Sequence, residues 1–195
     1  MLLAAVAVVT GVVAYAGWKL TARSAYEAAQ YSVMEADGRF EMREYPDLML
    51  ATTDMQSDAE GKDGSFMRLF RYIDGANAES EKVAMTIPVF MGDARDEMAF
   101  VLPGNMPEEA IPAPSSKRVR IRQRPAGQFA VVCFSGRLTT ETAARAEQEL
   151  REWMQQQGLE GDPDAISAGY DPPWTPGPLR RNEVLVRLRD PIEKS

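Results

Sequence analysis

Short runs of alternating hydrophobic and polar residues dominate the first half of the chain, a pattern typical of β-strands. Residues 31–45 (YSVMEADGRFEMREY) hold two such runs joined by Asp37-Gly38, which predicts a hairpin. In the second run Phe40 and Met42 alternate with Glu41 and Arg43. Three further strands are predicted at residues 47–55 (DLMLATTDM), 83–91 (VAMTIPVFM) and 97–103 (EMAFVLP).

The period of the pattern changes to that of a helix in two places. Residues 65–77 (SFMRLFRYIDGAN) place four apolar residues at helical spacing, with Asp63 or Ser65 as the N-cap and Gly75 as the stop. These four are Phe66, Leu69, Phe70 and Ile73. Residues 139–158 repeat the pattern, from a capping Thr139 or Thr140 to a terminating Gly158. We expect both apolar faces to pack on the sheet.

The chain also repeats itself weakly. Residues 118–134 (RVRIRQRPAGQFAVVCF) resemble residues 40–50 when the two segments are aligned with one constant offset in residue number, which places Pro125 on Pro46. The second helix follows, and residues 165–171 and 183–188 predict two closing strands. Two such halves indicate an α+β fold, a curved antiparallel sheet or β-barrel of two repeated halves with two helices outside.

The amino terminus differs from the rest of the chain. Residues 1–18 (MLLAAVAVVTGVVAYAGW) carry no charged side chain, and at 1.5 Å per residue they span roughly 27 Å, close to the hydrocarbon thickness of a bilayer. We expect a single-pass membrane anchor, followed by a helical stalk at residues 19–30 and a domain at residues 31–190. A cleaved signal ending at Ala14-Tyr15-Ala16 and a buried core helix are the alternatives. Lys19 and Arg23 favour a cytoplasmic domain, whereas an export signal favours the opposite side.

Composition narrows the chemistry. The chain has no histidine, which excludes Ser-His-Asp and Cys-His catalysis, histidine metal sites and the commonest haem ligand. Its single cysteine, Cys133, lies in an apolar run and is expected to be a small buried hydrophobe, with a thiolate haem ligand as the alternative. A net charge of −7 argues against nucleic-acid binding.

The segment before the last strand is rich in proline. Residues 170–179 (YDPPWTPGPL) contain too many prolines to pair in a sheet, so we expect a stiff extended connection. We predict that Arg180, Arg181 and Glu183 anchor the turn by charged hydrogen bonds and that Trp174 closes an edge of the core. Catalysis by Glu183 is the alternative, although no partner acid or base accompanies it.

Three blocks together resemble one family. FMRLFRYIDGAN, VAMTIPV and YDPPWTPGPLRRNEVLVRL occur in order and are similar to the signature blocks of the SOUL haem-binding proteins. The resemblance covers roughly residues 31–188 and implies a distorted β-barrel of two pseudo-symmetric halves with two helices outside. It also implies non-covalent binding of haem or another tetrapyrrole, without established enzymatic activity.

The resemblance makes the first helix the candidate haem site. It implies that Met67 and Phe70 touch the macrocycle and that Arg71, with Arg68 one turn earlier, lies near a propionate. A plain structural role for this helix is the alternative. We therefore expect a monomeric, membrane-tethered haem carrier, with iron held weakly by water, Tyr, Met or Cys133, or not held. An enzyme acting on a tetrapyrrole or lipid-like substrate through Glu41, Glu44 or Glu183, and a binding domain for other apolar molecules, are the other hypotheses.

Overall fold

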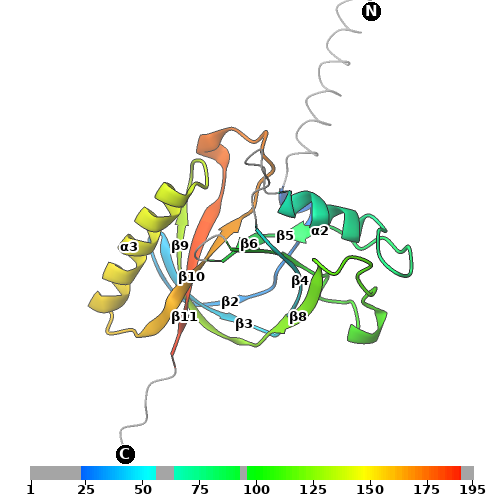
Figure 1. Ribbon diagram of the computed structural model, residues 1–195. Coiled ribbons are helices and arrows are strands. Elements are labelled where there is room, and N and C mark those ends of the chain that lie inside the picture. The colour runs from blue at the N-terminus through cyan, green and yellow to red at the C-terminus, as the bar shows by residue number, and fades with distance from the viewer. Residues whose placement is uncertain (1–22, 56–63, 93–95, 190–195) are drawn as a thin grey trace, which may run out of the picture.

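A curved antiparallel sheet with one helix outside each half organises the protein (Figure 1). The computed structural model describes residues 23–55, 64–92 and 96–189. Its strands are β1 (Glu27–Ala28), β2 (Ser32–Asp37), β3 (Phe40–Tyr45), β4 (Leu48–Asp54), β5 (Thr86–Ile87), β6 (Val89–Met91), β7 (Glu97–Val101), β8 (Arg120–Arg124), β9 (Gly127–Phe134), β10 (Gly161–Gly169) and β11 (Asn182–Leu188). The α-helices are α2 (Ser65–Ile73) and α3 (Thr140–Gln156), and short 3-10 turns are η1 (Arg23–Ala25), η2 (Glu108–Ala110) and η3 (Gly177–Leu179).

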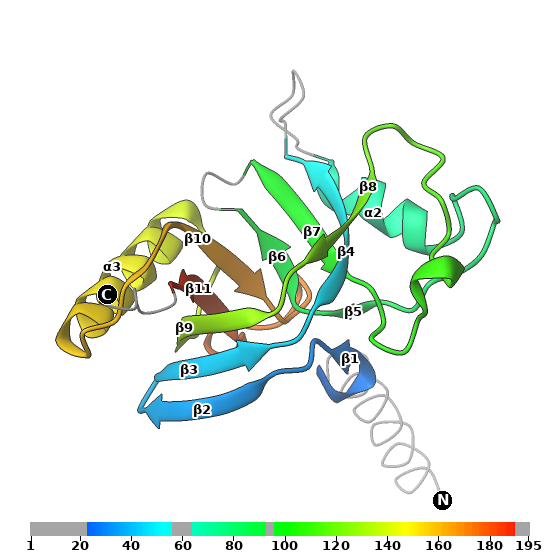
Figure 2. The same ribbon diagram turned by 90° about the horizontal axis from the view of Figure 1, so that it is seen from below.

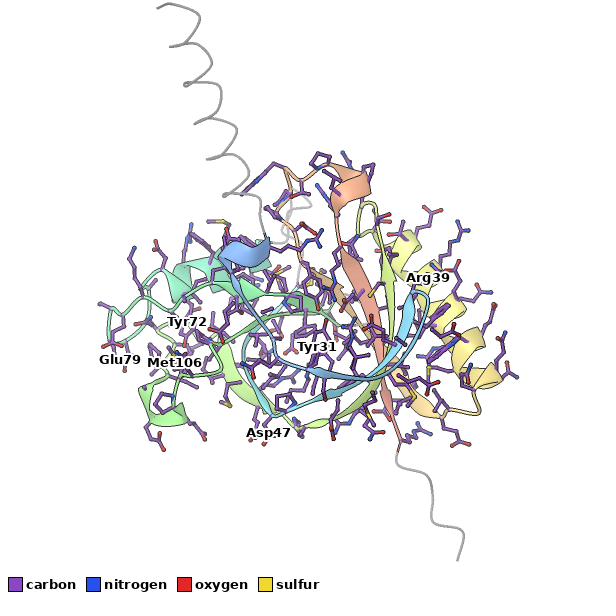
Figure 3. The ribbon with its side chains drawn as sticks, turned by 180° about the vertical axis from the view of Figure 1, so that it is seen from behind. Tyr31, Arg39, Asp47, Tyr72, Glu79 and Met106 are labelled. Carbon is purple, nitrogen blue, oxygen red and sulfur yellow. The ribbon has the colours of Figure 1, made fainter. Side chains whose placement is uncertain are left out.

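The strand order records the internal repeat. Within the described residues the large sheet runs β2-β3-β9-β11-β10-β6-β7-β4-β8. In the repeat, β3 corresponds to β8, β4 to β9, β6 to β10 and β7 to β11. If each strand is replaced by its counterpart, the order from β3 to β8 reads backwards and every pair of neighbouring strands is kept. The two bends that follow β3 and β8 lie together, because Asp47 accepts a 2.6 Å hydrogen bond from the Ala126 amide (Figures 2 and 3). The predicted repeat of two halves is therefore present.

The sheet does not close into the predicted barrel. Its edge strands, β2 and β8, each pair on one side only among the described residues. All six residues of β2 are exposed, so no face of this strand is buried against β8. The predicted α+β class with two outer helices is confirmed, and the structure is a strongly curved open sheet.

The core lies in three parts. Inside the curve, Tyr45, Phe90, Phe129, Tyr170 and Leu185 form the centre of one cluster. A second cluster joins α2 to β4 and β7, and a third joins α3 to β9 and β11. The central residues of β9 are therefore buried on both faces: Phe129 and Val131 contact the interior of the curve, and Ala130 and Val132 contact α3.

The first described residues are packed on the domain instead of forming a helical stalk. β1 pairs in parallel with β5, and Ala29 is buried and donates its amide to the Ile87 carbonyl at 2.8 Å. The expected membrane segment at residues 1–18 lies outside the described residues. Among the helices that are described, none has the length and hydropathy needed to cross a bilayer.

Candidate functional site

Helix α2 turns a different face to the core from the one that the sequence predicted. It begins after Gly64, whose φ of 66° places it in the left-handed region that favours glycine. The predicted cap Asp63 lies outside the described residues, and Ser65 is the first helical residue. Leu69, Tyr72 and Ile73 are buried against the sheet, whereas Phe66 and Phe70 are exposed. The expected burial of Phe66 and Phe70 is wrong, because Tyr72 occupies the core and donates to the Pro112 carbonyl at 2.8 Å.

The exposed side of α2 carries an apolar surface made of Phe66, Met67 and Phe70, which we call the α2 surface. The rings of Phe66 and Phe70 are nearly parallel, with centroids 6.2 Å apart, and Phe66 also meets the buried Phe100 edge-on at 5.2 Å. Three large apolar side chains exposed within two turns of one helix are more than the scattered single residues of an ordinary protein surface. Their arrangement suits contact with a flat apolar molecule.

The two arginines of α2 are placed differently. Arg68 donates from Nε to the Thr53 hydroxyl at 3.1 Å and from Nη2 to the Asp54 carbonyl at 2.5 Å, so its guanidinium is fastened to β4. Arg71 is exposed, and no hydrogen bond or ion pair of its side chain is found within the part of the chain that the structure describes. Of the four predicted site residues, Met67, Phe70 and Arg71 are therefore presented to solvent together, whereas Arg68 braces the helix.

A buried charged cluster forms a second candidate, centred on Glu183 of β11. Its carboxylate accepts from Arg43 at 2.8 and 3.0 Å, from Arg181 Nε at 2.8 Å and from the Tyr170 hydroxyl at 2.8 Å. Arg43 and Glu183 are both fully buried, and the ring of Tyr31 covers the Arg43 guanidinium at 4.2 Å. The hypothesis that Arg181 and Glu183 anchor the turn across the fold is confirmed.

The electrostatics of this cluster oppose catalysis. Burial disfavours the ionised form of Glu183, but hydrogen bonds and charges from Arg43 and Arg181 outweigh it and lower the pKa of this carboxyl. Burial raises the pKa of Tyr45 to about 12, and burial with the nearby Glu183 charge raises that of Cys133 to about 11. At neutral pH each group keeps its ordinary charge, and Glu183 has no oxygen left to receive a substrate proton.

The other carboxylates of the enzymatic hypothesis do not complete an active site. Glu41 is bound to Arg43 Nε at 2.6 Å, and Glu44 is exposed on β3. The sequence missed Arg43 as a core residue because it alternates with Phe40 and Met42, which pack towards α3, whereas Arg43 is buried on the opposite face of β3. The available signal was a second Arg-Glu pair with a spacing of two residues, formed by Arg181 just before β11 and Glu183 within it.

Iron ligation is restricted by the same contacts. Tyr45, Tyr72 and Tyr170 are buried, and the Cys133 thiol lies 3.4 Å from both Arg43 and Glu183. Met67, with its thioether sulfur, is the exposed side chain of the α2 surface that could approach a bound iron. A protein ligand to iron on this surface would therefore be Met67.

Two hollows elsewhere fit a tetrapyrrole poorly. A cleft of about 210 Å³ lies between β1 and the bend after β3, and it is smaller than most sites for organic ligands. An open hollow of about 400 Å³ on α3 is lined mainly by charged and amide side chains, among them Glu147, Arg151 and Glu152. The α2 surface has the better chemistry for an apolar ring.

The structure is an α+β domain that exposes an apolar face of α2. The family model described as "SOUL heme-binding protein" matches residues 26–187, which is most of the chain. The protein therefore belongs to the SOUL heme-binding protein family, and the resemblance drawn from the three sequence blocks is confirmed. The family is a binding family and not an enzymatic one.

Solved structures share the fold at low identity. A hydrolase from Listeria innocua is 12% identical, with a TM-score of 0.56 over 80% of this chain and 94% of that one. The C-terminal domain of EcmrR is also 12% identical, with a TM-score of 0.54 over 83% of this chain and 99% of that one. An uncharacterised conserved protein from Listeria innocua gives a TM-score of 0.55 at 13% identity, over 77% of this chain and 91% of that one. No curated protein matches the sequence. At these identities the likeness concerns the fold alone.

Proposed function

We propose that this protein binds haem or a related tetrapyrrole non-covalently on the α2 surface, without a histidine ligand. The observation that carries the proposal is the exposure of Phe66, Met67 and Phe70 on the helix that the family resemblance singles out. Burying roughly 300 Å² of apolar area at 25 cal/mol per Å² supplies about 7.5 kcal/mol, which corresponds to a micromolar Kd.

The tether is part of the same proposal. The charge-free residues 1–18 anchor the protein in a membrane, and the domain then buffers, carries or delivers the tetrapyrrole beside that membrane. Binding fits this chain better than turnover, because Glu41 and Glu183 are engaged with buried or half-buried arginines.

A haemin titration of residues 23–195, followed by absorbance, tests the binding. A saturable Soret change with micromolar midpoint and no bis-histidine features supports the proposal. A linear, unsaturable response equal to that of an unrelated acidic protein rejects haem binding while leaving the fold untouched.

Substitutions of the two arginines of α2 should differ in their effect on the haem affinity measured by that titration. Arg71→Ala should weaken haem binding roughly ten- to a hundredfold, because it removes one charge-assisted contact to a propionate. Arg68→Ala should mainly lower the melting temperature, because Arg68 is fastened to Thr53 and Asp54. Equal affinities for both variants and the parent would place the ligand elsewhere on the domain.

A further inference from the structure

The two most exposed large apolar side chains of the described residues belong to one loop outside α2. Trp174 is 67% exposed and Leu179 is 65% exposed, and both belong to residues 171–181, which we call the proline loop. Figure 1 shows this loop at the top of the molecule, between β10 and β11. The expected role of Trp174 in closing the core is therefore wrong: the loop holds the indole out in solvent.

The proline loop is braced in this position. Arg180 donates from Nε to the Thr175 carbonyl at 2.7 Å and from Nη2 to the Pro173 carbonyl. The Arg181 amide donates to Asp171 at 2.6 Å, and the Gly136 amide donates to the Gly177 carbonyl at 2.9 Å. Prolines further restrict the backbone. Covering Trp174 and Leu179 with a partner would therefore cost little conformational entropy, because the loop is already ordered.

Arg23, which follows the apolar segment closely in sequence, contacts this same loop. Arg23 donates to the Asp171 carboxylate at 3.0 Å and to the Leu179 carbonyl at 2.7 Å. Five residue steps separate Trp18 from Arg23, and a fully extended chain covers at most about 18 Å in that number. If residues 1–18 span a bilayer, the proline loop is held within that reach of its surface.

The local charge suits an anionic surface. The protein as a whole carries a net charge of −7, yet residues 172–180 contain no acidic residue. Arg180 lies in the loop, and the exposed Arg137 follows Gly136, the residue bonded to Gly177. Tryptophan is enriched where membranes meet water, and arginines there pair with lipid phosphates.

We propose that the proline loop is a membrane-docking element, in which Trp174 and Leu179 enter the headgroup region of an anionic bilayer. The proposal rests on the anchoring role proposed above for residues 1–18, and it adds a second contact that fixes the orientation of the domain. With the anchor alone, the domain would rotate freely on its tether. With both contacts, the end of the domain that carries the loop faces the lipid.

Lipid-borne quenchers test the docking in the full chain. Trp18→Phe protein is reconstituted in phosphatidylcholine vesicles containing one quarter phosphatidylglycerol, with or without dibrominated acyl chains. Its remaining tryptophans are Trp174 and Trp153, and Trp153 is buried and stacked on Phe40 at 5.3 Å. Bromolipid should abolish most of the Trp174 emission, defined as the part that Trp174→Phe removes.

A matched control moves the same side chain. Gln156→Trp in the Trp18→Phe/Trp174→Phe background places an indole on the exposed last turn of α3, at the lower left of Figure 1, and should not be quenched. Vesicle flotation separates the two proposals. A chain that floats while Trp174 is quenched no more than the residue-156 indole overturns the docking alone. A chain that fails to float overturns the anchor and the docking with it.

Discussion

Arg43→Met should lower the free energy of unfolding by about 3–5 kcal/mol, the usual cost of removing one partner from a buried ion pair. The substitution keeps an unbranched side chain of similar length, but it removes two hydrogen bonds to Glu183 and leaves that carboxylate buried beside Arg181 and Tyr170. Urea denaturation of residues 23–195 at neutral pH measures the difference.

Arg122→Met is the control for this loss. Arg122 pairs with Glu97 on the surface of β8, so its removal should cost less than about 1 kcal/mol. Replacing both members of the buried pair, as Arg43→Met with Glu183→Leu, should recover part of the stability. Equal losses for Arg43→Met and Arg122→Met would contradict a strongly coupled buried pair.

The sign of the pH dependence follows from Glu183. Its pKa is lowered in the folded state, so its contribution is complete above the unfolded value of about 4.3 and is lost as the pH falls through the folded value. The stability gap between the parent and Arg43→Met should therefore shrink in acid. A gap that stayed constant below that pH would show that Arg43 acts through packing alone.

Met67→Glu should weaken haem binding by about ten- to a hundredfold. The change removes apolar contact worth about 1.5–3 kcal/mol and places a carboxylate where a propionate-bearing ring would lie. Because Met67 is off the buried face of α2, the melting temperature should stay near that of the parent. Absorbance titration with haemin measures the affinity.

Met34→Glu provides the matched comparison. Met34 and Met67 are each 48% exposed, but Met34 lies on the edge strand β2, which is separate from α2. Its substitution adds the same charge to the protein and should leave haem affinity unchanged. If both variants bind equally weakly, net charge and not the α2 surface controls the affinity.

The pattern of the sequence predicted the elements well, because each depends on local spacing. The hairpin at Asp37-Gly38, both helices and the repeat marked by Pro46 and Pro125 appear where they were expected. The family blocks also identified the correct family. The resemblance also pointed to α2, where Met67 and Arg71 are exposed, and their role in binding stays a prediction.

Burial could not be predicted where two surfaces compete for one residue. Phe66 and Tyr72 lie on different sides of α2, and only the packing against β4 and β7 decided that the tyrosine is buried and the phenylalanine exposed. Arg43 was assigned to a polar face because its partner Glu183 lies far away in the sequence and next to it only in the folded sheet. The sequence favours a core position for Trp174 because its side chain is large and apolar, but the hydrogen-bonded proline loop holds it in solvent.

The sequence by itself therefore determined the elements, their repeat and the family, since alternation, helical spacing, turn residues and motif order all act over short stretches of chain. Tertiary structure decided the open sheet, the buried Arg43–Glu183 pair, the exposed α2 surface and the position of Arg23 against the proline loop. Each of these depends on contacts between segments far apart in sequence. The free energy of such contacts comes from burial and charge pairing that exist only after the chain has folded.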